Sequence, residues 1–262
     1  MGDGMYRFLL TPKWIVGHVL LVVTVVSFVN LGFWQLRRLD ERLKHNALIE
    51  QRLAAAPAPL DELLRTVGSE PTALDFRRVV VTGRYQPDNQ LLTAPRSRDG
   101  RPGPQVLTVL HRDGDRGPVL LDRGWIPFDR DTLRAPPAPD GQVRIEGVVR
   151  APEEGAIGAA EQVARIVPEQ IGVRIGQPLP AFYVQLWEQR PPLGEATPLP
   201  GRAPVLTEGN HLSYALQWFS FALIALIGYP VLVRRAARER RGGDSDGGRP
   251  APEERPARMP IR

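Results

Sequence analysis

The chain has 262 residues, with 34 Lys and Arg against 29 Asp and Glu, giving a formal net charge of +5. It contains no cysteine, which excludes disulfides, CxxCH haem attachment and cysteine-based copper or zinc sites. Residues 234–262 hold nine Arg and five Asp or Glu, so most of the positive charge belongs to a C-terminal tail. The high isoelectric point therefore does not indicate nucleic-acid binding, which would need a basic face on a folded domain.

Two long stretches of the chain carry no charged residue, Trp14–Leu36 and Gly209–Val233. At 1.5 Å per residue, each would form a helix of about 34 Å or more, enough to cross a hydrocarbon core of about 30 Å. We therefore predict transmembrane helices at 14–36 and 209–233. One alternative is a pair of buried helices in a soluble protein. A cleaved signal peptide would have a shorter apolar run, so we expect the first stretch to be a retained anchor.

The charges beside the two stretches predict the orientation in the membrane. Five arginines lie directly behind the second stretch, which is the positive-inside pattern and places the C-terminus in the cytoplasm. Two spans return the N-terminus (1–13) to that side, leaving 37–208 as an extracytoplasmic domain and 234–262 as a basic, disordered cytoplasmic tail. The predicted location is the cell (plasma) membrane. The basic residues that follow the first span disagree with the pattern, but long loops translocate largely regardless of charge.

The region between the spans is predicted to be mostly β. Helical spacing continues after the first span until about Pro57, and a short helix is expected at 60–67. Alternating or β-branched segments predict strands at 76–85, 105–112, 118–127, 142–152 and 181–187. We expect a turn at 87–89, a loop at 97–104, one or two helical turns at 167–176 and a linker at 188–209. The predicted fold is therefore two transmembrane α-helices flanking one mostly β (α+β) domain, a small sandwich or barrel-like sheet.

No catalytic motif or metal-ligand spacing emerges from the sequence. The four histidines are isolated, and a local salt bridge is the ordinary interpretation of Asp122 beside Arg123. We therefore predict that the protein is not an enzyme, with a membrane-anchored hydrolase of unrecognised type as the remoter alternative.

His211 is the most informative polar residue because it opens the second span. On a helix, His211, Tyr214 and Trp218 share one face, and Ala215 and Ala222 beside that face would leave space for a flat ligand. An imidazole at the membrane edge is costly unless it meets protein, water or a metal. It could be an interfacial residue bonded to a headgroup or carbonyl, or an axial ligand to haem iron.

The arginines that close the first span would lie at the level of His211. Arg37 and Arg38 could then pair with anionic haem propionates. His18 would lie near the inner face, too far to ligate the same iron, and is expected to form a helix–helix contact.

Several segments together resemble the surfeit locus protein 1 family: GFWQLRR, FRRVVVTGRY, the APR of 94–96, LLDRGWIP, VRIEGVVR and NHLSYALQW. The resemblance runs from about Asn30 to Arg235. Gly32, Trp34, Gln35 and Arg38 fit the first motif; Arg123, Gly124 and Pro127 fit the R-G-W-I-P turn; His211, Tyr214 and Trp218 fit the last. A segment with N-P, Trp and R-D that many relatives carry before the last strand is replaced by EQVARIVPEQIGVRIG.

The resemblance implies a membrane-anchored assembly factor for cytochrome c oxidase that binds haem a and assists its insertion into the catalytic subunit. The implied partners are that catalytic subunit, haem a synthase and the lipid membrane. The haem-binding candidates are His211 (to the iron), Tyr214, Trp218, Trp34, Arg37 and Arg38. A haem-free scaffold that stabilises a nascent oxidase subunit is the alternative.

Overall fold

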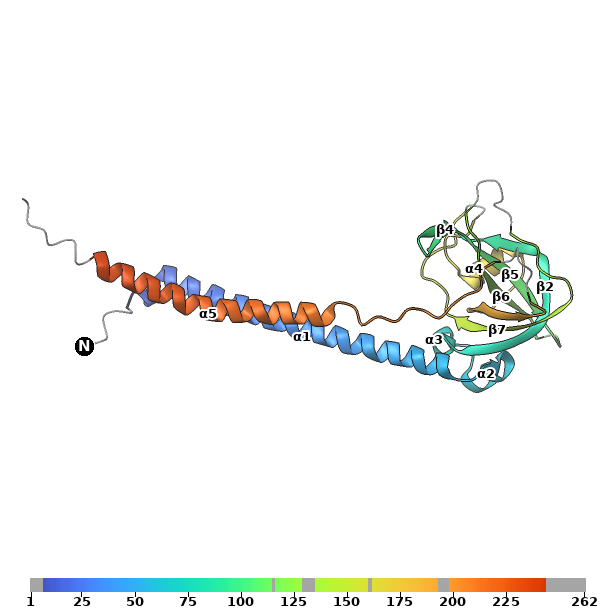
Figure 1. Cartoon of the computed structure of the whole chain (residues 1–262), viewed down its shortest axis with the longest axis horizontal. Coiled ribbons are helices and arrows are strands. Elements are labelled where there is room, and N and C mark those ends of the chain that lie inside the picture. The colour runs from blue at the N-terminus through green and yellow to red at the C-terminus, as the bar shows by residue number, and fades with distance from the viewer. Residues whose placement is uncertain (1–6, 115, 129–134, 160–161, 193–197, 244–262) are drawn as a thin grey trace, which may run out of the picture. The chain divides into compact units, whose positions relative to one another are not determined.

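The computed structural model describes residues 7–114, 116–128, 135–159, 162–192 and 198–243 (Figure 1). The chain divides into two compact units, which we treat separately. The first, called the helix unit below, comprises Met1–Lys44 and Thr207–Arg262. The second, called the β unit, comprises His45–Leu206.

The helix unit is built from α1 (Pro12–Ala54) and α5 (His211–Gly243), preceded by the short 3₁₀ helix η1 (Arg7–Leu10). Both long helices are apolar enough to cross a membrane, and only 6% of the most apolar window of each is buried. Such exposed apolar surface is unlike that of core helices in a soluble protein and supports membrane anchoring. α1 ends at Ala54, ahead of Pro57 as predicted.

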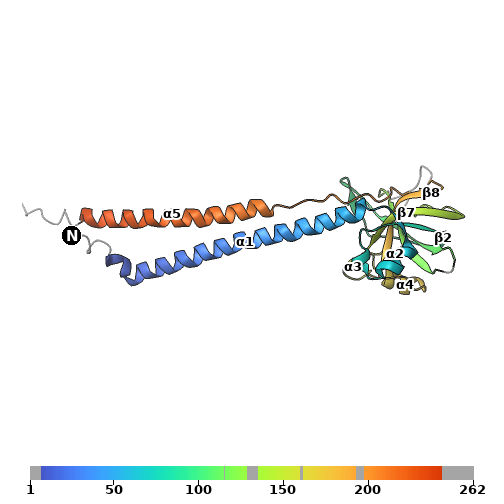
Figure 2. The same cartoon turned by 90° about the horizontal axis from the view of Figure 1, so that it is seen from below.

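The two helices run side by side in antiparallel directions (Figures 1 and 2). Near the start of α5, a Cβ added to Gly32 would lie 2.5 Å from the ring of Phe219. Phe28 contacts Trp218 with ring centroids 5.6 Å apart, and Phe33 contacts Phe219 at 5.4 Å. The helices therefore approach closely where a glycine leaves room for an aromatic ring.

Within its described residues, the β unit contains eight strands and three short helices. In chain order these are β1 (Ala58–Pro59), α2 (Leu60–Val67), α3 (Pro71–Leu74), β2 (Arg78–Leu92), β3 (Arg96–Arg98), β4 (Arg101–Gly103), β5 (Gln105–Arg112), β6 (Pro118–Trp125), β7 (Gln142–Arg150), α4 (Pro168–Ile175) and β8 (Tyr183–Arg190). The strands predicted from alternation and the helix predicted at 60–67 are confirmed. The predicted helical turns at 167–176 are confirmed as α4.

Five of these strands close into a barrel. The sheet order is β1-β2-β5-β6-β8-β7, and β2 also pairs with β7, so β2, β5, β6, β8 and β7 form a ring. All pairings around the ring are antiparallel except β6 with β8. The structure thus decides for the barrel over the sandwich, and a closed ring leaves those five strands without a free edge.

Alternation along the strands separates two apolar clusters. Val119 and Leu121 of β6 pack in one cluster, which α2 also joins. Leu120, between them, packs in the other, with Ile171 of α4. Because successive side chains of a strand point to opposite faces, one strand feeds both clusters.

Two predicted connections are wrong. Residues 87–89 form no turn, because β2 continues through them and its register with β5 shifts between Gln86 and Leu91. Pro87 has no N–H to donate, and a bulge accommodates it within the strand. The predicted loop at 97–104 contains the β3–β4 hairpin instead. Its two central residues, Asp99 (φ 53°) and Gly100 (φ 78°), have the left-handed conformation of a two-residue turn, and the Asp-Gly pair was the available signal.

The predicted linker at 188–209 begins later than expected. β8 extends to Arg190, and further on Leu199 forms an antiparallel bridge with Trp125. Two backbone hydrogen bonds make this bridge, from Trp125 N to Leu199 O (2.9 Å) and from Leu199 N to Trp125 O (2.7 Å). The segment around Leu199, which belongs to the β unit, is therefore attached to the barrel.

Candidate functional site

The start of α5 meets the end of the apolar part of α1 through one polar contact. His211 Nδ1 lies 2.9 Å from Gln35 Oε1. Gln35 is buried, with 9% of its surface exposed, whereas His211 is half-buried. A side chain built at Gly209 would have its Cβ 3.5 Å from His211 Nε2, so glycine keeps that side of the ring uncrowded.

The aromatic candidates lie at two levels of the helix pair. Tyr214 and Trp34 are exposed, at 49% and 47%, near the Gln35 contact. Trp218 is two turns further along α5 and packs against Phe28. The structure therefore brings Tyr214 and Trp34 to the same end as His211, while Trp218 takes part in helix packing.

The arginine candidates follow Gln35 on the same helix. Arg37 and Arg38 are both exposed. Arg38 forms an ion pair with Glu41 at 2.6 Å, with side-chain exposures of 54% and 61%. The three-residue spacing places the two side chains on one face of the helix, and such an exposed pair contributes little stability.

The expectation that small residues leave space for a ligand is wrong. Ala215 is 1% exposed and Ala222 is 4% exposed. Their small side chains lie in the helix–helix interface, where they permit close approach. Any flat ligand would have to occupy another face.

The opposite end of the helix pair carries a second polar contact. The hydroxyl of Tyr229 is hydrogen-bonded to Nδ1 of His18, and His18 Nε2 lies 3.2 Å from the carbonyl oxygen of Leu9. The predicted helix–helix role of His18 is confirmed. With both ring nitrogens engaged, this histidine is a packing residue.

In the β unit, the predicted salt bridge between Asp122 and Arg123 does not form. The two residues are adjacent in β6, so their side chains point to opposite faces of the sheet. Both are fully buried. Arg123 donates to Gln90 Oε1 (2.8 Å) and to the carbonyls of Pro136 (2.9 Å) and Pro137 (3.0 Å).

Asp122 lines the wall of a cavity of about 220 Å³. Its carboxylate accepts hydrogen bonds from Gln105 Nε2 (2.8 Å), Gln185 Nε2 (3.4 Å) and Gly124 N (3.0 Å). Burial raises the pKa of Asp122 to about 6, although the bonds from Gly124 and Gln185 oppose the rise. The cavity is a polar pocket that sequence reasoning missed, because its walls come from distant strands.

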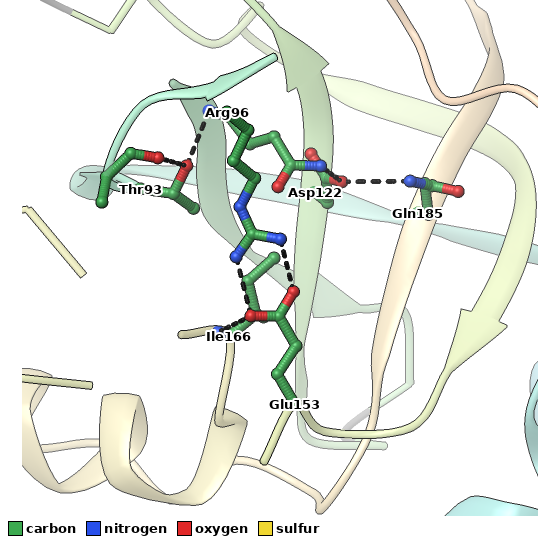
Figure 3. Close-up of polar contacts among 8 residues, drawn as sticks. Thr93, Arg96, Asp122, Glu153, Ile166 and Gln185 are labelled. Atoms are coloured by element: carbon green, nitrogen blue, oxygen red, sulfur yellow. Dashed lines mark hydrogen bonds and ion pairs between the residues drawn. The ribbon is translucent and has the colours of Figure 1, made fainter. Parts of the chain in front are cut away.

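An ion pair stands beside this cavity. Arg96 binds Glu153 through two hydrogen bonds of 2.5 and 2.7 Å, drawn in Figure 3. Burial opposes ionisation of Glu153, but Arg96 and the N–H of Ile166 hold the pKa of this carboxyl below its usual value. Across residues 7–114, 116–128, 135–159, 162–192 and 198–243, no three His, Cys, Asp or Glu side chains gather to hold a metal ion.

The comparisons with known proteins agree with this architecture. The model of the SURF1 family matches residues 22–223. The chain belongs to the SURF1 family. An uncharacterized SURF1-like protein of Mycobacterium tuberculosis is 32% identical over 246 residues, which cover 89% of this chain and 88% of the relative. A SURF1-like protein of Monosiga brevicollis is 30% identical over 260 residues, covering 90% and 92%. The cytochrome oxidase assembly protein SHY1 of Saccharomyces cerevisiae is 32% identical over 114 residues, covering 44% of this chain and 28% of SHY1.

The R-G-W segment of this SURF1 family member has a structural explanation. Arg123 binds the 136–137 carbonyls, and Gly124, with φ 124°, leaves room for the Leu199 carbonyl. Trp125 donates its indole N–H to Arg96 O at 3.1 Å. Of the three, Gly124 and Trp125 join the barrel to the segment leading to α5, through Leu199.

Proposed function

We propose that this chain is a membrane-anchored assembly factor for cytochrome c oxidase that binds haem a and assists its insertion into the catalytic subunit. The contact between His211 and Gln35 carries the proposal. It brings the one histidine at the start of α5 beside the segment of α1 that ends in Arg37 and Arg38. Membership of the SURF1 family and the printed name of the yeast relative support the role in oxidase assembly.

The residues at this contact suit a haem. Nδ1 of His211 is engaged with Gln35, whereas Nε2 has no hydrogen-bond partner within the described residues. Gly209 places no side chain against that nitrogen. Neutral imidazole is a common ligand of haem iron, and the exposed rings of Tyr214 and Trp34 offer flat apolar surface nearby.

The arginines would bind the propionates. Guanidinium groups pair with carboxylates by two parallel hydrogen bonds, and Arg37 and Arg38 are exposed beside Gln35. Arg38 would exchange its bond to Glu41 for a propionate. The exchange costs little because an exposed ion pair contributes about 0–1 kcal/mol.

A carrier must release what it binds, and a single protein ligand that is only half-buried favours weak binding. When bound, haem a supplies the iron and its redox chemistry. This chain's residues hold it and present it to the oxidase catalytic subunit, after transfer from haem a synthase. No catalytic step by the chain itself is needed.

We also propose that both termini are cytoplasmic, with the β unit outside the plasma membrane. The antiparallel helix pair and the arginines after the second span support this orientation. A reporter that is active only in the cytoplasm should be active when fused after residue 262 and inactive when inserted at residue 140. The reverse pattern would overturn the orientation.

The decisive experiment is to co-express the full chain with the haem a biosynthetic enzymes, purify it in detergent and record its absorption spectrum. We expect bound haem a in the wild type and its loss in His211→Ala. The matched control is His45→Ala, because His45 is an exposed histidine further along α1.

Each other result has a defined meaning. An unchanged spectrum in His211→Ala would remove this residue as the ligand. A haem-free wild type that still co-purifies with the oxidase catalytic subunit would favour the scaffold. Turnover of a substrate by haem-extracted protein would favour the hydrolase.

A further inference from the structure

Gln35 is a polar side chain buried in a helix pair whose other contacts nearby are apolar. One turn before it, Gly32 packs against Phe219, and Phe33 touches the same ring. Burying an amide costs free energy unless it finds a hydrogen-bond partner. Gln35 finds that partner in His211, 176 residues away in the chain.

The chemistry of the two atoms fixes the direction of this bond. The amide oxygen Oε1 can only accept, so Nδ1 of His211 must carry the hydrogen. A neutral imidazole has one N–H, which leaves a lone pair on Nε2. That nitrogen is the one beside Gly209, which has no side chain to place against it.

We propose that Gln35 is a positioning residue that holds His211 in the Nδ1–H tautomer and so presents Nε2 to iron. The tautomer part stands on the contact alone. The part that concerns iron rests on the proposed function and names the residue that controls its ligand. Metal-binding histidines commonly donate their second ring N–H to an outer partner, which fixes the ring orientation.

The neutral charge of Gln35 has a further consequence for release. A carboxylate in this position would draw the Nδ1 proton more strongly and make Nε2 a stronger donor to ferric iron. An amide oxygen polarises the ring less. Gln35 therefore orients the ligand while keeping the bond to iron weak, as delivery requires.

The first test needs no haem. The purified full chain, labelled with ¹⁵N-histidine in detergent at a pH where imidazole is neutral, should show the His211 proton on Nδ1. The resonances are assigned by their loss in His211→Ala. In Gln35→Leu the proton should move largely to Nε2, as in free imidazole side chains.

The matched control is Asn30→Leu. Asn30 is an exposed amide on the same helix that donates to Val26 O, 2.8 Å away within that helix. It should leave the His211 tautomer unchanged. A wild type with its proton on Nε2, or a Gln35→Leu variant with the wild-type tautomer, would overturn the inference.

The second test uses haem-loaded protein. Gln35→Leu should retain about tenfold less haem a than the wild type. Gln35→Glu should retain more ferric haem than the wild type and show a lower reduction potential. A merely structural role for Gln35 would not move the potential in that direction.

The two tests separate this inference from the function on which its second part rests. Absence of haem together with an Nδ1–H tautomer would contradict the haem proposal and leave the role of the Gln35–His211 contact intact. Haem bound through His211 together with an Nε2–H tautomer in the free protein would contradict the role of Gln35 and leave the haem proposal intact.

Discussion

Replacing Gly124 by alanine should weaken the attachment between the barrel and the segment that leads to α5. Gly124 has φ 124°, a conformation that side chains rarely adopt. An added Cβ would lie 2.1 Å from the carbonyl oxygen of Leu199, which is backbone and cannot rotate away. The Leu199 segment must therefore move, and the bridge to Trp125 must break.

The cost follows from these contacts. Holding a residue other than glycine at this φ costs about 1–3 kcal/mol. Losing the two backbone hydrogen bonds of the bridge, at 2.9 and 2.7 Å, costs about 1 kcal/mol each. The free energy of unfolding of the β unit should fall by roughly 3–5 kcal/mol.

Pulse proteolysis of the full chain in detergent across a urea series measures this change, because protease cleaves only the unfolded fraction. Gly100→Ala is the control, since Gly100 also has a positive φ (78°) but its added Cβ would meet nothing within 4 Å. It should cost only about 1–2 kcal/mol. Equal losses in the two variants would refute the role assigned to the Leu199 contact.

Three further substitutions test the barrel and the helix pair. Burial raises the pKa of Asp122 from 3.8 to about 6. The protonated side chain therefore makes its full contribution to the free energy of unfolding below pH 4, and this contribution is lost as the pH rises through 6. Asp122→Asn should remove that loss of about 3 kcal/mol. Pulse proteolysis gives the free energy of unfolding of the wild type and the variant, and a difference between them that is equal at pH 4.5 and 7.5 would contradict this. Arg123→Met should lower the free energy of unfolding by about 3–5 kcal/mol by leaving three acceptors without their charged donor, measured in the same way; a loss under about 1 kcal/mol would count against the network. Gly32→Leu should separate the helices, because its side chain would meet the Phe219 ring, and should reduce disulfide formation between cysteines introduced at positions 35 and 211 several-fold. Gly228→Leu, at a position with open space, should not.

Local pattern alone was enough to predict the longer helices and strands of this protein, but not β1, α3 or the β3–β4 hairpin. The charge-free stretches predicted both long apolar helices, because a span needs only length and apolar side chains. Strands β5 to β8 followed from alternation and β-branched residues, which act over a few neighbours. His211 was singled out because a polar residue at the membrane edge needs a partner.

Contacts between segments that are distant in the chain could not be predicted from the sequence. Alternation predicted a barrel or a sandwich equally, since only the pairing of β2 with β7 closes the ring. Asp122 and Arg123 looked like a pair because they are adjacent, yet the pleat sends them to opposite faces. The small side chains of Ala215 and Ala222 predicted space for a flat ligand, because the sequence does not show that α1 packs against them.

The sequence by itself determined that this chain has two apolar helices, a β-rich region between them and a histidine at the start of the second helix. Only the tertiary structure decided which nitrogen of that histidine is engaged, because its partner Gln35 lies 176 residues away. The physical reason is range: hydrophobic periodicity is set by near neighbours, whereas a hydrogen bond forms only once distant segments have been packed within about 3 Å.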